Sequence, residues 1–250
     1  MKNKKIYYII VPTVILLIWA VFSNLKIISP LFLSTPQAVF LEIVNLSSSG
    51  AIIPDILFTL YRTFLGFMIA CLIGIPIGLL MGYSDKVYYS LELVVEFFRS
   101  IPATALFPLF LLFFGIGDQS KIALTAWAAG LVLILSSMYG VHLGKELRIK
   151  SAKTMKMSGL ILFKKIIFPE ALPQIFSGMR IAISLSLIIV VVTEMFIGTN
   201  FGLGHRIIDA QLVYRIPEMY ATILIVGTLG FLINKGFILA EKRIVHWKGK

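Results

Sequence analysis

The chain has 250 residues, of which 58% are hydrophobic and 14% are charged, and its mean hydropathy is +0.94. Soluble domains are about 45–50% apolar and about 25% charged, so this composition indicates an integral membrane protein. The formal net charge of +11 does not indicate nucleic-acid binding, because the basic residues form short clusters beside apolar runs. A single cysteine, Cys71, excludes an intrachain disulfide, and the three histidines lack metal-ligand spacing; we expect no metal and no cofactor.

Six apolar segments predict membrane-spanning helices, each of which needs about 20 mostly apolar residues. In chain order they cover residues 6–25, 63–84, 100–117, 122–144, 171–196 and 219–240. The first follows a basic start, but it is too long for the apolar region of a signal peptide and no small-residue cleavage site follows, so we expect a retained anchor. The predicted fold is an all-α membrane protein with six transmembrane helices. Residues 1–34 would form the anchor helix and an outer segment, and residues 35–250 the transmembrane domain.

Two shorter helices are predicted between these spans. Residues 36–46 read as an amphipathic helix outside the cytoplasm, and residues 85–99 as an interfacial helix that leads into the third span. Arg99 ends the second of these helices. Its simplest role is that of an anchor whose charge reaches the cytoplasmic interface, and the alternative is a gate or an ion pair with Glu96.

Small residues recur every four positions along the second span and form one stripe on a helix. The stripe consists of Gly66, Ala70, Gly74, Gly78 and Gly82. Such a stripe lets another helix approach closely, where van der Waals packing replaces the absent hydrophobic drive. The neighbour is either another helix of the same chain or a second subunit. Pro76 removes a backbone hydrogen bond within the stripe and predicts a bend.

The fifth span contains two ionisable residues, Arg180 and Glu194, about 21 Å apart along a helix. A carboxylate within a membrane is costly unless it faces a partner or a wet cavity. Glu194 therefore either lines the translocation path or its outer gate, or makes a structural hydrogen bond near the interface. Thr193 and Ser184 add polar atoms to the candidate path, as Arg99 does at its inner end, although such hydroxyls often bond their own helix backbone. No catalytic constellation is found.

A basic segment, residues 144–173, interrupts the apolar pattern between the fourth and fifth spans. Six spans place both termini on one side of the membrane. If that side is the cytoplasm, the lysines and arginines left outside are only Lys26, Arg62, Lys121, Arg206 and Arg215. The positive-inside rule therefore places residues 144–173 and both termini in the cytoplasm.

Several short motifs, spread over most of the chain from about Thr35, together resemble a known family. They are Thr59-Leu60-Tyr61-Arg62, Gly74-Ile75-Pro76-Ile77-Gly78, Arg99-Ser100-Ile101-Pro102, Ala105-Leu106-Phe107-Pro108-Leu109, Phe114-Gly115-Ile116-Gly117, Gly178-Met179-Arg180-Ile181-Ala182, Glu194-Met195 and Gly202-Leu203-Gly204. The chain resembles the membrane subunits of bacterial ABC importers that take up nitrate, sulfonates, taurine and thiamine-precursor pyrimidines.

The resemblance implies a cytoplasmic coupling loop with the consensus E-A-A-x3-G-x9-I-x-L-P, whose two short helices dock into a groove of the ATPase subunit. The residues it implies for coupling are Ala152, Thr154, Met155, Ser158, Gly159, Leu162, Phe163, Ile166 and Pro169. The chain departs from the consensus at Lys150, Ser151 and Lys156. Lys156 replaces the glycine of the turn, and Gly159 is a candidate to make that turn instead. These departures leave open whether coupling is weakened or redirected.

The same resemblance implies the permease subunit of a type I ABC importer in the bacterial cytoplasmic membrane, working as a homodimer. ABC ATPase subunits would hydrolyse ATP, so the chain itself is not expected to be an enzyme, and an extracytoplasmic binding protein would deliver the small solute. An ion-gradient-driven secondary transporter is the alternative; it predicts inverted repeats and several buried ionisable residues. A membrane scaffold without transport is the third possibility.

Overall fold

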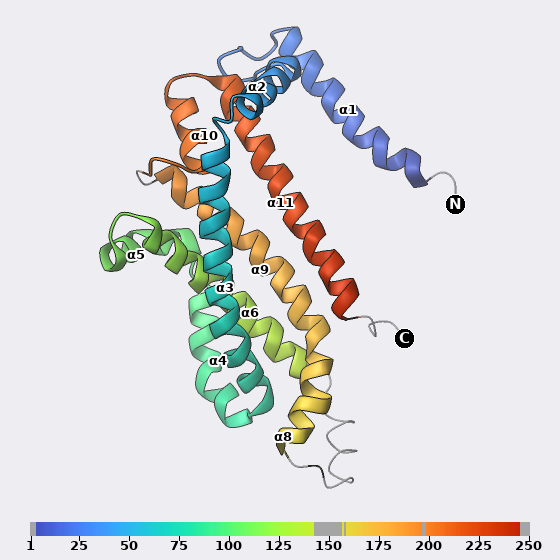
Figure 1. The fold of residues 1–250 in the computed structure, drawn as a ribbon, viewed down its shortest axis with the longest axis vertical. Helices are drawn as coiled ribbons and strands as arrows, with labels where there is room; N and C mark the ends of the chain where they lie inside the picture. Colours follow the sequence, from blue (N-terminus) through green and yellow to red (C-terminus); the bar gives the residue numbers. More distant parts are fainter. Residues whose placement is uncertain (1–3, 143–156, 158, 197–198, 246–250) are drawn as a thin grey trace.

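The computed structural model describes residues 4–142, 157, 159–196 and 199–245, which form helices joined by short connections (Figure 1). The elements are α1 (Lys4–Asn24), α2 (Pro36–Ser48), α3 (Ile53–Tyr83), α4 (Asp85–Arg99), the 3₁₀ turn η1 (Ala103–Leu106), α5 (Phe107–Phe114), α6 (Asp118–His142), α8 (Gly159–Leu162), the π-helical turn η2 (Phe163–Ile167), α9 (Phe168–Phe196), α10 (Leu203–Leu212) and α11 (Ile216–Ile244). The two predicted short helices, 36–46 and 85–99, are confirmed as α2 and α4.

Within the described residues, four helical segments are long and apolar enough to cross a membrane. They are α3, α6, the continuous run from η2 through α9, and α11. Helix α1 has 21 residues, and the part of it whose side chains are described, Ile9–Asn24, is apolar. The described residues thus establish four spanning helices of the six predicted, or five if the bent region described next is counted as one span.

The predicted third span, residues 100–117, does not form one continuous helix. The chain turns by 88° between α4 and the η1–α5 segment, so this region is a broken span or a re-entrant loop. Pro102 explains the bend, and Gly115 ends the helix that follows it. Pro102 lies outside either helix with an extended ψ of 124°, and Gly115, with φ of 75°, ends the eight-residue α5.

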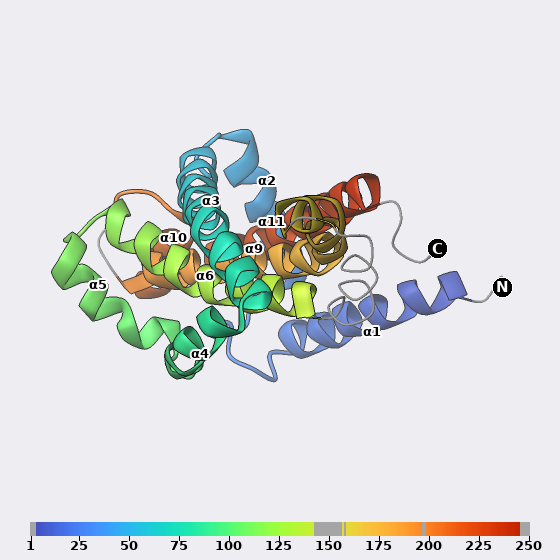
Figure 2. The same ribbon diagram turned by 90° about the horizontal axis from the view of Figure 1, so that it is seen from below.

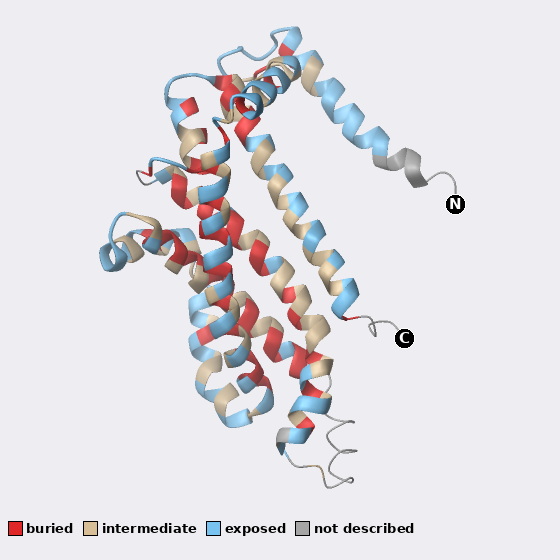
Figure 3. Ribbon diagram, viewed as in Figure 1, coloured by how far each residue is buried: buried red, intermediate tan, exposed pale blue. Residues whose placement is uncertain are grey.

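The core is a bundle of α3, α6 and α9, in which the small-residue stripe of α3 faces α6. A Cβ atom added to Gly74 would lie 2.7 Å from the carbonyl oxygen of Gly130, and one added to Gly82 would lie 2.8 Å from that of Met138. The backbones of α3 and α6 are therefore close enough to exclude larger side chains. In Figure 3 the buried residues concentrate along these contacts. The structure places the stripe at an intramolecular helix contact, and Pro76 lies inside α3 without interrupting it.

Helices α1 and α11 lie at the edge of this bundle. Viewed from below, α1 runs along the side opposite α5 (Figure 2). It contacts the rest of the chain near its C-terminal end, where Trp19 stacks on Tyr220 at 6.1 Å and donates a hydrogen bond to the carbonyl oxygen of Ser34. Most of its remaining length is exposed.

The bundle has two distinct ends. We call the end formed by α2, α10 and the first turns of α3 and α11 the α10 end. We call the opposite end, where α8, η2 and the last turns of α3 and α6 meet, the α8 end. They lie at the top and bottom of Figure 1.

Candidate functional site

An arginine inside α3 joins three separate segments at the α10 end. Arg62 is 2% exposed, and its Nε atom donates to Asp118 at the start of α6 at 2.7 Å. Its Nη1 atom donates to Glu194 near the end of α9 at 2.5 Å and to the carbonyl oxygen of Phe201 at 2.9 Å. Because three of its hydrogen bonds reach different parts of the chain, Arg62 fixes the relative positions of α3, α6 and α9.

The carboxylate of Glu194 is almost completely buried, at 1% exposure, and is fully engaged within the fold. Besides Arg62, it accepts hydrogen bonds from the hydroxyl of Thr59 at 2.8 Å and from the backbone N–H of Gly204 at 3.1 Å. Gly202 packs directly against it, with φ of 147°, and a Cβ atom there would lie 2.5 Å from the Glu194 carboxyl carbon. A glycine at 202 is therefore needed both for its backbone conformation and for the close approach.

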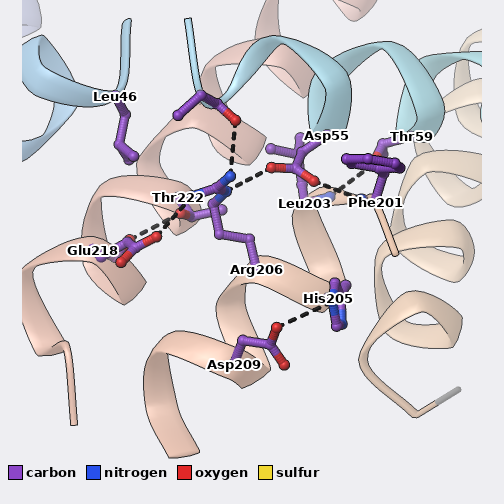
Figure 4. A network of polar contacts seen from close by, with 12 residues as sticks. Leu46, Asp55, Thr59, Phe201, Leu203, His205, Arg206, Asp209, Glu218 and Thr222 are labelled. Carbon is purple, nitrogen blue, oxygen red and sulfur yellow. Dashed lines mark hydrogen bonds and ion pairs between the residues drawn. The ribbon is translucent and has the colours of Figure 1, made fainter. Parts of the chain in front are cut away.

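A second arginine extends this network to the start of α11 (Figure 4). Arg206 of α10 donates to Asp55 at 2.6 Å, to Glu218 at 2.8 Å and to the carbonyl oxygen of Ala51 at 2.8 Å. Burial lowers the pKa of Arg206, but the hydrogen bonds and charges of Asp55 and Glu218 outweigh this, so the net pKa lies above its ordinary value. The guanidinium is charged at every physiological pH. The segment that contains α10 is thereby fastened to both α3 and α11.

Sequence reasoning missed this network because it began the second span at residue 63 and assigned Arg62 to an outer segment. In the structure α3 begins at Ile53, so Arg62 lies within the helix. Asp55, Thr59 and Arg62 stand at i, i+4 and i+7, which places them on one helical face. That spacing was the available signal. Lys121 was likewise assigned to an outer segment, but it is fully buried and its Nζ atom donates to the carbonyl oxygen of Gly117.

The other candidate path residues are not gathered around Glu194. Thr193 and Ser184 donate their hydroxyl hydrogens to backbone carbonyls of their own helix, those of Val190 and Arg180. Arg99 lies at the end of α4, where it pairs with Glu96 at 2.6 Å; both side chains are about half exposed. The geometry thus includes the ion pair that the sequence offered as an alternative for Arg99.

At the α8 end, the described part of the predicted coupling loop packs against the ends of α3, α6 and α9. Ala152, Thr154, Met155 and Ser158 lie outside the described residues, whereas Gly159, Leu162, Phe163, Ile166 and Pro169 lie within them. Leu162 packs in one apolar cluster with Leu79 of α3, Val141 of α6 and Ala171 of α9. Phe163 meets the ring of Tyr83 edge to face at 5.8 Å.

Gly159 does not make the turn suggested for it. It opens α8 and is absent from the described glycines with positive φ. Its small size serves packing instead, because a Cβ atom there would lie 3.1 Å from the Tyr83 hydroxyl. Lys164 and Lys165 follow on η2 and are exposed. This segment therefore combines an apolar attachment to the bundle with two cationic side chains that face outward.

Among the described residues, no group of three or more histidine, cysteine, aspartate or glutamate side chains could hold a metal ion. The buried carboxylates of the α10 end are held by arginines instead.

Comparison with known proteins connects this arrangement to transport. Residues 74–245 match the family described as binding-protein-dependent transport system inner membrane component. The chain is 30% identical over 246 residues to a putative aliphatic sulfonates transport permease, SsuC, of Bacillus subtilis strain 168, covering 96% of this chain and 87% of that protein. It is 31% identical over 242 residues to the taurine transport system permease TauC of Escherichia coli K12, covering 95% and 88%.

Solved structures give the same fold. A chain of the MetNI methionine ABC transporter, in an inward-facing conformation, superposes with a TM-score of 0.68 at 21% identity, covering 77% of this chain and 95% of that chain. These findings confirm the expected importer permease and decide against the ion-gradient-driven alternative. The chain belongs to the binding-protein-dependent transport system inner membrane component family and is a membrane-spanning ABC transporter permease.

Proposed function

We propose that the chain imports a small sulfonate, taurine or nitrate across the bacterial cytoplasmic membrane as a homodimeric permease. Two ABC ATPase subunits would bind its α8 end and supply all ATP hydrolysis, and an extracytoplasmic solute-binding protein would deliver the solute at the α10 end. The solute class rests on the names of the similar permeases, which include a nitrate import permease of Synechocystis at 30% identity over 187 residues. The orientation rests on the distribution of lysine and arginine.

The observation that best supports this proposal is the packing of the α8–η2 segment against the helix bundle. Leu162 and Ile167 are buried against the last turns of α3 and α6 and the first turn of α9. A force on this segment would therefore act on three spanning helices together rather than on a loose loop. The packing explains how ATP-driven movement of a partner could rock the bundle, because rigid helices transmit a displacement along their length.

The exposed lysines of η2 test coupling better than the buried apolar residues of this segment do, because changing them leaves the packing intact. Lys164→Glu and Lys165→Glu reverse charges at exposed positions, so insertion and thermal stability should stay within about 1 kcal/mol of wild type. In vesicles containing the complete complex, these variants should reduce solute-stimulated ATP hydrolysis severalfold. Lys242→Glu is a matched charge reversal at an exposed position in the last turn of α11, away from the segment. Equal stimulation in all variants would overturn the coupling role.

The homodimer is supported by the exposure of the α5 region. Leu112, Phe113 and Ile116 are 84%, 75% and 79% exposed in the single chain, and a second copy would cover part of this apolar surface. The translocation path would then run between the copies. Native mass spectrometry of the complete complex should give two permease chains, whereas a single copy would contradict the proposal.

For Glu194, the geometry supports the structural interpretation over the gate. Its oxygens already accept hydrogen bonds from Arg62, Thr59 and Gly204, and 1% exposure leaves no open approach for a solute in this conformation. We therefore propose that Glu194 stabilises the outer ends of the helices. A Glu194→Gln variant should lose thermal stability while its KM for uptake remains near that of wild type; a large change in KM at unchanged stability would restore the gate.

The solute class is tested by uptake in proteoliposomes that contain the complete complex and its binding protein. ATP-dependent accumulation of radiolabelled taurine, an alkanesulfonate or nitrate is the expected result. Uptake that persists without ATP but follows an imposed ion gradient would contradict the importer.

A further inference from the structure

The turn between α10 and α11 carries a tyrosine in a backbone conformation that favours glycine. Tyr214 has φ of 57°, and Lys26, with φ of 55°, is the other non-glycine residue with positive φ in the described part of the chain. The N–H of Arg215 donates to the carbonyl of Ala210 at 2.8 Å, and the N–H of Tyr214 to that of Gln211 at 3.1 Å. These two bonds form a Schellman motif, whose left-handed position is usually occupied by glycine. A bulky side chain at this position is disfavoured by its own backbone.

The strained tyrosine is also the last residue of an exposed apolar tip. Leu212, Val213 and Tyr214 are 70%, 59% and 68% exposed, so little of their apolar surface is buried within the chain. Burial therefore gives little compensation for the unfavourable backbone of Tyr214. Strained conformations that persist in this way concentrate at binding and switch sites.

Ion pairs next to the tip restrain its backbone. Arg215, directly after Tyr214, pairs with Glu218 at 2.8 Å, and Glu218 also binds Arg206, which binds Asp55 of α3 (Figure 4). The turn is thus tied to α10, α11 and α3. A binding surface that is already ordered loses less conformational entropy when its partner docks.

The position of the tip favours an aqueous partner over lipid. Trp19 and Tyr220 stack on each other, as aromatic residues of the membrane interface do, and Tyr220 stands four residues inside the start of α11, about 6 Å along the helix. Tyr214 precedes that start and so lies beyond this aromatic level. Exposed charged side chains flank the tip: Arg215 is 62% exposed and Asp209 is 50% exposed.

We propose that Leu212, Val213 and Tyr214 form a docking anchor for the solute-binding protein. The inference rests on the proposed function, which places the α10 end outside the cytoplasm. A rigid aromatic side chain that follows two exposed apolar residues and has charged residues around it has the composition of an interface hot spot. The partner surface would present an apolar depression that accepts the tyrosine ring.

Binding is measured with the complete permease–ATPase complex in nanodiscs, using the solute-loaded binding protein whose gene neighbours that of the permease. Tyr214→Gly relieves the backbone strain and removes the ring, so it should melt no earlier than wild type yet bind the binding protein roughly tenfold more weakly or worse. Tyr214→Phe should retain most of the affinity. Lys26→Gly relieves the same kind of strain at an exposed position on a different loop, and should leave the affinity unchanged. A Tyr214→Gly complex with wild-type affinity would overturn the inference.

The outcomes also separate this inference from the proposed function. If the binding protein neither binds the wild-type complex nor stimulates its ATP hydrolysis, the proposed function itself fails. If wild type responds and Tyr214→Gly responds equally, only the docking anchor fails.

A labelled thiol distinguishes the competing occupants of the tip. In a Cys71→Ala background, a fluorophore on the Tyr214→Cys variant should be quenched by iodide, and the binding protein should protect it. Quenching by lipid-soluble quenchers alone, before the binding protein is added, would assign the tip to lipid and overturn the inference. Efficient disulfide cross-linking between two copies of this variant would assign the tip to the second permease, with the same consequence.

Discussion

Replacing Arg62 by methionine tests whether the buried network stabilises the fold. The change removes the donors that Arg62 supplies to Asp118, Glu194 and the Phe201 carbonyl. Asp118 is 36% exposed and can be solvated, but Glu194 is buried and would keep only the hydrogen bonds from Thr59 and Gly204. Leaving one partner of a buried ion pair alone costs about 3–5 kcal/mol. For a chain of this length, this corresponds to a fall in Tm of about 6–20 °C.

The assay is thermal unfolding of the purified permease in detergent, followed with a thiol-reactive fluorophore. Cys71 is the single cysteine and lies half-buried in α3, so its reaction with the dye reports the opening of the bundle. The double variant Arg62→Met/Glu194→Met removes both charges. It should recover most of the lost stability, because apolar replacement of a buried ion pair is often neutral or stabilising.

Two results would refute this reasoning. One is an Arg62→Met variant that unfolds within about 1 kcal/mol of wild type, which would mean that Glu194 finds water or another partner. The other is a double variant no more stable than the single one, which would mean that the loss comes from packing of the arginine stem rather than from the unpaired carboxylate.

Two further predictions concern helix packing and the second arginine. Gly78→Leu should destabilise the α3–α6 contact by about 1–3 kcal/mol, because even a Cβ atom at Gly78 would lie 2.8 Å from that of Ser137. Gly130→Ala on α6 is its control: the added Cβ meets nothing within 4 Å, so thermal unfolding should show no loss, and a loss there would contradict the geometry. Arg206→Gln should cost about 3 kcal/mol because Asp55 and Glu218 are buried, whereas Arg215→Gln, at a position 62% exposed, should cost less than about 1 kcal/mol. Equal losses of Tm in these two variants would contradict the assigned roles.

The sequence predicts the spanning segments well where apolar length alone decides. The apolar runs at 122–144 and 171–196 coincide closely with α6 and α9. It fails at residues 100–117, because composition does not distinguish one continuous helix from a chain that bends at Pro102 and ends its short helix at Gly115. Residues 100–117 contain enough apolar side chains for a spanning helix, but their backbone does not form one continuous helix.

The buried network was only partly predictable. A carboxylate at 194 signals the need for a partner, but its main partner is 132 residues earlier in the chain, and no local pattern encodes so distant a pairing. Arg62 also lies beside polar residues, so hydropathy alone shortens α3 at its start. The positions of Asp55, Thr59 and Arg62 on one helical face were readable, whereas the identity of the segment they meet depends on the tertiary fold.

The ion pair of Arg62 has a consequence for how the chain is assembled in the membrane. During synthesis α3 emerges long before α9. Arg62 can therefore pair with Glu194, which lies 132 residues later in the chain, only after α9 has been made. An arginine at the centre of an inserting helix costs about 2.5–3.5 kcal/mol, and Arg62 stands nearer the start of α3, whose long apolar remainder favours insertion. Asp118 arrives first, 56 residues after Arg62, and provides an interim counter-charge at the start of α6. We therefore expect helix insertion and final docking to be separate events in biogenesis, with the α10 end of the bundle closing only after α9 has left the ribosome.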